Sequence, residues 1–112
     1  MGSIGYAQIK FQKAESHQLV VDQCKLSRKV IFYYIESSEC SKCSKIAEKG
    51  LEENEVGKLY NSTFYSIKIS NKSQQFKDLV NMFPKIEHSL FAFISPDNYL
   101  VEFVTYVSNA KF

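Results

Sequence analysis

Apolar residues along the chain recur at spacings that predict alternating helices and strands. Apolar positions three and four residues apart, which share one face of a helix, mark residues 16–28, 41–51 and 73–83. Two runs, residues 30–35 and 90–94, are almost continuously apolar, and residues 64–69 alternate as a strand does. With a weaker strand at residues 9–11, the predicted order is β-α-β-α-β-α-β-β.

The run at residues 30–35 has no polar face, which predicts a strand covered on both sides in a parallel or mixed sheet. The turn at residues 95–98 contains Pro96 followed by Asp97 and Asn98, a type I signal. The flanking segments, residues 90–94 and 99–106, therefore form an antiparallel hairpin. Residues 107–112 could begin a helix but are too few to complete one.

The helical pattern predicts which residues face the core and which residues cap the helices. The first helix, residues 16–28, is predicted to turn one side inward, which carries Leu19, Val20, Gln23 or Cys24, and Ser27. Cys24 is therefore interpreted as a small core residue rather than a reactive thiol, and His17 as a solvated polar residue. Asn54 is expected to cap a short helix over residues 55–60, and Asn71 or Ser73 the helix that ends before Pro84.

Composition narrows the class of protein without identifying it. A chain of 112 residues is expected to form a single domain, with residues 1–8 a tag or a loose terminus. The net charge of +2 does not indicate nucleic-acid binding, and no apolar run reaches the length of a membrane span. We expect a monomer, and an exported protein rather than a cytoplasmic one if residues 1–3 replace a removed signal peptide.

Candidate chemistry is concentrated in Cys40-Ser41-Lys42-Cys43, between the strand at residues 30–35 and a predicted helix. Residues three apart at a helix start lie about 5–6 Å from each other, within the separation that a disulfide tolerates. The unpaired N–H groups and dipole of a first helical turn favour a thiolate, most of all at Cys40. Lys42 adds a nearby positive charge, which Glu39 opposes.

From residue 9 to residue 106 the chain resembles the thioredoxin fold, and within it small thioredoxin-like domains common in exported bacterial proteins. The resemblance rests on VIFYYI, CSKC, KIAEKGLEENEVGKLYNSTFYSIKIS and FKDLVNMFPKIEHSLFAFISPDNYLVEF. It implies an α/β domain with a central mixed four- to five-stranded sheet flanked by helices and a short or absent C-terminal helix. It also implies a thiol–disulfide oxidoreductase, with Cys40 as nucleophile and Cys43 as resolving thiol.

On this resemblance the partners are protein thiols and disulfides and a redox partner protein, and no cofactor is expected beyond a reversible Cys40–Cys43 disulfide. Three positions depart from the family pattern. Glu39 replaces a tryptophan, Tyr34 replaces a buried acid, and Ser89, preceded by His88, replaces a cis-proline. Because a cis bond before a residue other than proline costs about 2.5–4 kcal/mol, we expect a trans bond and a reshaped substrate groove.

Three interpretations therefore remain open. The first is an oxidoreductase in which Glu39, Ser41, Lys42, His88 and Ser89 surround the cysteine pair, with His88 either tuning the Cys40 thiolate or serving as a polar loop residue. The second is a non-catalytic thioredoxin-like binding module. The third is a metal site using Cys40, Cys43 and His88, which is disfavoured because structural zinc requires four ligands.

Overall fold

The computed structural model describes residues 9–13, 16–37, 42, 45, 48, 49, 51 and 54–105. Its centre is a four-stranded sheet in the order β2-β1-β3-β4. The strands are β1 (Val30–Glu36), β2 (Phe64–Ser70), β3 (Ser89–Ile94) and β4 (Leu100–Thr105). β1 runs parallel to β2 and antiparallel to β3, and β4 completes an antiparallel hairpin with β3. The mixed sheet and its hairpin are as predicted.

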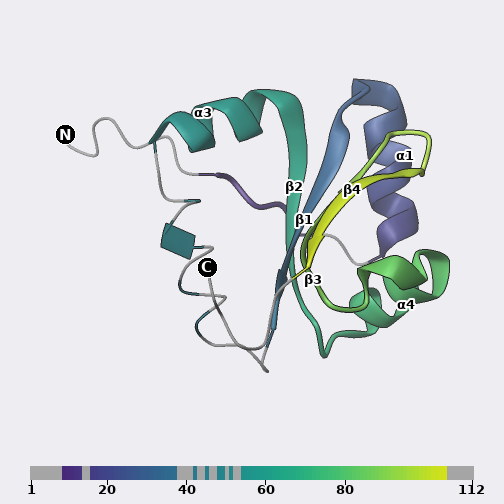
Figure 1. The fold of residues 1–112 in the computed structure, drawn as a ribbon. Coiled ribbons are helices and arrows are strands. Elements are labelled where there is room, and N and C mark those ends of the chain that lie inside the picture. Colours follow the sequence, from purple (N-terminus) through teal and green to yellow (C-terminus); the bar gives the residue numbers. More distant parts are fainter. Residues whose placement is uncertain are drawn as a thin grey trace.

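Helices cover both faces of this sheet. α1 (His17–Ser27) and α4 (Gln74–Met82) lie on one side, and α3 (Asn54–Thr63) lies on the other (Figure 1). The 3-10 turn η1 (Pro84–Ile86) ends the α4 segment, as the position of Pro84 predicted. α3 runs three residues beyond its predicted end and includes Asn54 as its first residue.

Serine caps fix the starts of two helices. The Ser16 hydroxyl accepts a hydrogen bond from the Leu19 amide at 3.3 Å, and the Ser73 hydroxyl accepts one from the Phe76 amide at 3.1 Å. These bonds satisfy amides that have no partner within the helix. Both helices therefore begin one residue after a serine, which confirms the predicted cap at Ser73.

β1 is the buried centre of the molecule. Successive side chains of a strand point to opposite faces, and in β1 both faces are covered. Ile31, Tyr33 and Ile35 belong to a core that also contains residues of α1 and α4, whereas Phe32 and Tyr34 belong to a second core. All five are at most 1% exposed. This confirms the prediction of a strand covered on both sides.

The second core is an aromatic cluster around Phe32. Its ring centroid lies 4.9 Å from that of Tyr60, 5.0 Å from Phe93 and 5.6 Å from Phe91. Such spacings are typical of favourable aromatic pairs. The cluster joins α3 to β1 and β3.

The first predicted strand, at residues 9–11, is not formed. Instead a single parallel bridge pairs Gln12 with Ile67, and the Gln12 amide donates to the Ser66 carbonyl at 2.8 Å. Ile9 is nevertheless buried in the second core. Three alternating residues can thus direct an apolar side chain inward without a full ladder of hydrogen bonds.

No helix in the described part of the chain is both long and apolar enough to span a bilayer.

The inward face of α1 differs from the prediction: Gln23 and Ser27, placed on the inward side, are exposed, and two further residues differ more informatively. Leu19, expected inside, is 52% exposed, and His17, expected in solvent, is only 3% exposed. His17 is held by the Tyr33 hydroxyl, 2.7 Å from its Nδ1, and by the Asn98 amide oxygen, 2.8 Å from its Nε2. These contacts turn α1 so that Val20, Val21 and Cys24 face the core. Cys24, at 0% exposure, is the core residue that the sequence predicted.

Burial changes the pKa values of three core side chains, His17, Tyr33 and Cys24. Removal from water lowers the pKa of His17 below 6.5, partly offset by the hydrogen bond to Asn98. It also raises the pKa of the Tyr33 hydroxyl and of the Cys24 thiol above their usual values. At neutral pH these three side chains are therefore uncharged.

Candidate functional site

The candidate site is the end of the sheet at which β1 and β2 both finish and β3 begins. Because β1 and β2 are parallel and β3 is antiparallel to β1, this end presents Ser37, Asn71 and Ser89. The Asn71 amide N–H donates to the Glu36 carbonyl at 2.9 Å, and the Asn71 side chain donates to the Ser37 hydroxyl at 3.5 Å. These bonds fix the loop after β2 against the exit of β1.

The cysteine motif follows this exit directly in the chain. Cys40 comes three residues after Ser37, which is itself only 5% exposed. Glu39, Cys40, Ser41 and Cys43 lie outside the described residues, so their predicted roles remain predictions. Lys42 itself has helical backbone and an exposed side chain. In open α/β sheets, binding and reaction sites lie at the carboxyl ends of parallel strands.

Ser89 and His88 occupy the start of β3. The peptide bonds of the described residues contain no cis bond, so the bond before Ser89 is trans, as predicted. Ser89 pairs with Thr105 of β4 and is 1% exposed, yet within the described part of the chain its hydroxyl has no hydrogen-bond partner. His88 differs in being well exposed, and its Nε2 lies 4.0 Å from a Glu87 carboxylate oxygen.

Tyr34, at the position of the family's buried acid, has a carboxylate as its neighbour. Its hydroxyl donates to Glu48 Oε2 at 3.3 Å, and Lys68 Nζ lies 5.7 Å from the centre of its ring. Lys68 also lies 3.6 Å from a Glu36 carboxylate oxygen. The structure thus adds Glu48, Lys68 and Asn71 to the residues near this end of the sheet. Hydrophobic periodicity gave no signal for them, since all three are polar residues in ordinary surface positions.

No metal centre is formed by the described residues, among which no group of three histidine, cysteine or acidic side chains comes together. The Cys40–Cys43–His88 interpretation includes cysteines outside those residues and remains a prediction.

Two solved structures share this fold. One is a disulphide isomerase from Xylella fastidiosa Temecula1, with a TM-score of 0.61, 14% identity, and alignment over 86% of this chain and 79% of that chain. The other is described as a DsbH oxidoreductase, with a TM-score of 0.66, 14% identity, and alignment over 96% of this chain and 79% of that one.

The chain therefore has a thioredoxin-like fold, as its sequence predicted. Because the sequence identity is only 14% in both comparisons, the similarity shows the fold and nothing beyond it. No family model matches the sequence, and a search of curated proteins gives no match.

Proposed function

We propose that this protein carries out thiol–disulfide exchange on protein substrates through Cys40 and Cys43. The observation that carries the proposal is the position of the motif: a CxxC sequence begins four residues after Glu36, the last residue of a buried central strand in a thioredoxin-like fold. A CxxC motif in this structural context is typical of redox proteins. The two similar structures, a disulphide isomerase and an oxidoreductase, support the same class of reaction.

The reaction follows from the chemistry of the two thiols. The Cys40 thiolate attacks one sulfur of a substrate disulfide, so that a mixed disulfide forms and one substrate thiolate leaves. The Cys43 thiolate then attacks the Cys40 sulfur, and the second substrate thiolate is released. The substrate disulfide gains two electrons and the Cys40–Cys43 pair loses them. The reverse sequence oxidises a substrate dithiol, and the reduction potential of the pair determines the direction.

The test compares cysteine variants in the reduction of insulin by dithiothreitol. Cys40→Ser is expected to abolish acceleration, because the attacking sulfur is lost. Cys43→Ser is expected to accumulate a mixed disulfide that dithiothreitol releases. Cys24→Ala is the matched control, since that thiol is buried in the core, and it should retain the activity. An unchanged rate for Cys40→Ser, or a Cys40–Cys43 pair that does not titrate in a glutathione buffer, would refute the proposal.

The alternative of a non-catalytic binding module has its own support. The trans bond before Ser89 and the tyrosine at position 34 change two features that surround the cysteines in the family this chain resembles. Under this alternative a partner would be retained equally by the wild-type chain and by a Cys40→Ser/Cys43→Ser variant. Loss of partner binding in that double variant would favour the exchange reaction.

A further inference from the structure

A groove unrelated to the cysteine motif follows the outer side of α1, next to the start of β2. It consists of two adjoining pockets of about 540 Å³ and 320 Å³, which share Gln23 and Tyr65. The smaller pocket contacts Phe64, Tyr65 and Ser66, the first three residues of β2. Ser70, at the other end of this strand, borders the candidate redox site. The groove and that site therefore occupy opposite ends of the sheet.

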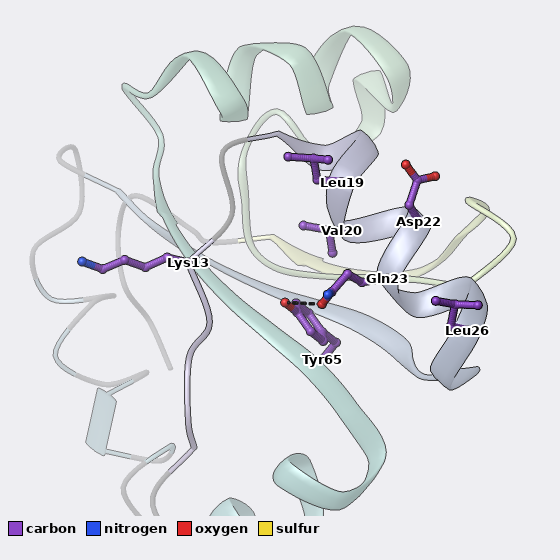
Figure 2. Close-up of a pocket in the computed structure, with 7 residues that line it drawn as sticks. All are labelled: Lys13, Leu19, Val20, Asp22, Gln23, Leu26 and Tyr65. Atoms are coloured by element: carbon purple, nitrogen blue, oxygen red, sulfur yellow. Dashed lines mark hydrogen bonds between the residues drawn. The ribbon is translucent and has the colours of Figure 1, made fainter.

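The larger pocket is apolar. Leu19 and Leu26, two turns apart on α1, form its wall although they are 52% and 89% exposed. Tyr65 of β2 lies across from them, and its hydroxyl donates to Gln23 at 3.1 Å (Figure 2). The Asp22 carboxylate points away from Tyr65, and the Lys13 side chain extends away from α1 (Figure 2). The charged groups of this pocket are thus turned out of its interior.

The smaller pocket is polar and positively charged. Of the described residues that line it, Lys10 and Lys29 are charged and none is acidic. Lys29 Nζ donates to the Asn61 carbonyl at 3.3 Å, and the Lys10 amide donates to the Asn61 side chain at 2.8 Å. Ser66 also lines this pocket; it is 2% exposed, and its hydroxyl has no hydrogen-bond partner among the residues that the structure describes. Buried hydroxyls are nearly always hydrogen-bonded, so this one is an unused donor next to the pocket, although its oxygen is almost inaccessible to solvent.

We propose that this groove binds a small anionic amphiphile, with its apolar part in the larger pocket and its carboxylate or phosphate group in the smaller one. Binding sites for small molecules usually have volumes of about 300–1,000 Å³, apolar walls and a few polar groups that orient the ligand. The groove has these properties. An apolar chain would cover Leu19 and Leu26, and an anion would complement the charges of Lys10 and Lys29.

The experiment titrates the protein with decanoate, below its micellar concentration, and follows binding by calorimetry. Decyltrimethylammonium is the matched ligand, since it has the same chain length and the opposite charge. We expect saturable binding of decanoate and at least about fivefold weaker binding of the cation, because the described lining of the smaller pocket contains two lysines and no acid. Equal binding of both ligands would overturn the proposal, since it would show that the lysines do not select the ligand.

Variants then test each pocket. Leu26→Ser should weaken decanoate binding about three- to tenfold, because it removes apolar area from the wall. Lys29→Gln should weaken it about two- to fivefold, and Lys10→Gln repeats this test at an exposed side chain if the Lys29 variant does not fold. Leu59→Ser and Lys77→Gln are matched surface controls on α3 and α4 and should bind as the wild type does.

Three results would contradict a site for a free small molecule. One is the same affinity in the groove variants as in their controls. Another is binding to phosphatidylglycerol vesicles without binding to monomeric decanoate. The third is a dimer that fails to bind decanoate and dissociates when Leu26 is replaced by serine, since a second copy of the chain would then cover the groove. Exchange activity does not enter any of these measurements, so the outcome is independent of the proposed redox function.

Discussion

His17 is a titratable residue inside the core, with a protein partner for each ring nitrogen. Burial lowers its pKa below 6.5 in the folded protein. The unfolded chain therefore binds a proton more readily than the folded chain as the pH falls. By linkage, folding stability is unaffected by His17 above about pH 6.5 and decreases below it. The decrease is at most about 1.4 kcal/mol for each pH unit below the pKa of the unfolded chain.

This dependence can be measured by urea unfolding between pH 7.5 and pH 5.0, followed by circular dichroism. The wild-type free energy of unfolding should decrease across this range, and His17→Gln should remove most of the slope. His88→Gln is the matched control, because His88 is well exposed, and it should keep the wild-type slope. A slope that is unchanged in His17→Gln would show that another group causes the pH dependence.

Cys24 is predicted to be chemically silent in the folded protein. It is 0% exposed, and burial raises the pKa of its thiol, which reduces the thiolate fraction that could react. In a Cys40→Ser/Cys43→Ser variant, Ellman's reagent should therefore detect no thiol under native conditions and one thiol per chain in urea. Rapid reaction of this variant without denaturant would contradict the burial of Cys24.

The sequence predicted Cys24 correctly but misplaced its neighbours on α1, and the reason is physical. A helical repeat shows that an apolar face exists, whereas the rotation of that face depends on contacts across the fold. His17 is held inside by Tyr33 and by Asn98, which is 81 residues away in the chain. Such long-range hydrogen bonds leave no mark in local periodicity. Leu19 was for the same reason predicted inside, although it lines an open groove.

At the scale of elements, the start of α4 is stabilised by the hydrogen bonds of its cap residue, Ser73. The Ser73 hydroxyl accepts from the Phe76 amide at 3.1 Å and also donates to the Ser70 carbonyl at 2.7 Å. Ser73→Ala removes both bonds and is expected to lower the free energy of unfolding by about 1 kcal/mol, with a range of about 0.5–2 kcal/mol. Urea unfolding of this variant, with the exposed Gln74→Ala as control, tests the prediction. Equal stability of the two variants would show that the cap contributes nothing.

The predictions of elements from sequence succeeded where local signals were strong. Six adjacent apolar residues predicted β1, and Ser73, one of the two residues predicted to cap the helix before Pro84, caps the start of α4. The segment at residues 9–11 failed as a strand because a strand requires a partner along its length, and the described chain pairs only at Gln12. For the candidate site, the resemblance to the thioredoxin fold directed attention to Ser89, which in the structure begins β3 next to the end of β1. The carboxylate next to Tyr34 could not be predicted, because Glu48 reaches it from a separate segment.

At the scale of the whole molecule, two apolar cores share a single strand. Tyr33 contributes to the core on the α1 and α4 side, whereas the adjacent Phe32 is the centre of the aromatic cluster on the α3 side. Side chains on opposite faces of β1 are thus fixed by the same backbone. If this coupling holds, the chain unfolds as one cooperative unit, and a loss of packing on one face destabilises the other face equally.

Phe32→Ala tests this coupling. It should lower the free energy of unfolding by about 3–5 kcal/mol, a large part of the roughly 5–15 kcal/mol typical of a domain. Phe32→Leu, which retains more volume, should have a smaller effect. Native-state hydrogen exchange gives the decisive measurement, because amides of α1 lie across the sheet from the substitution. Their protection should fall by the same free energy as that of β1. Unchanged protection in α1 would mean that the two cores unfold independently.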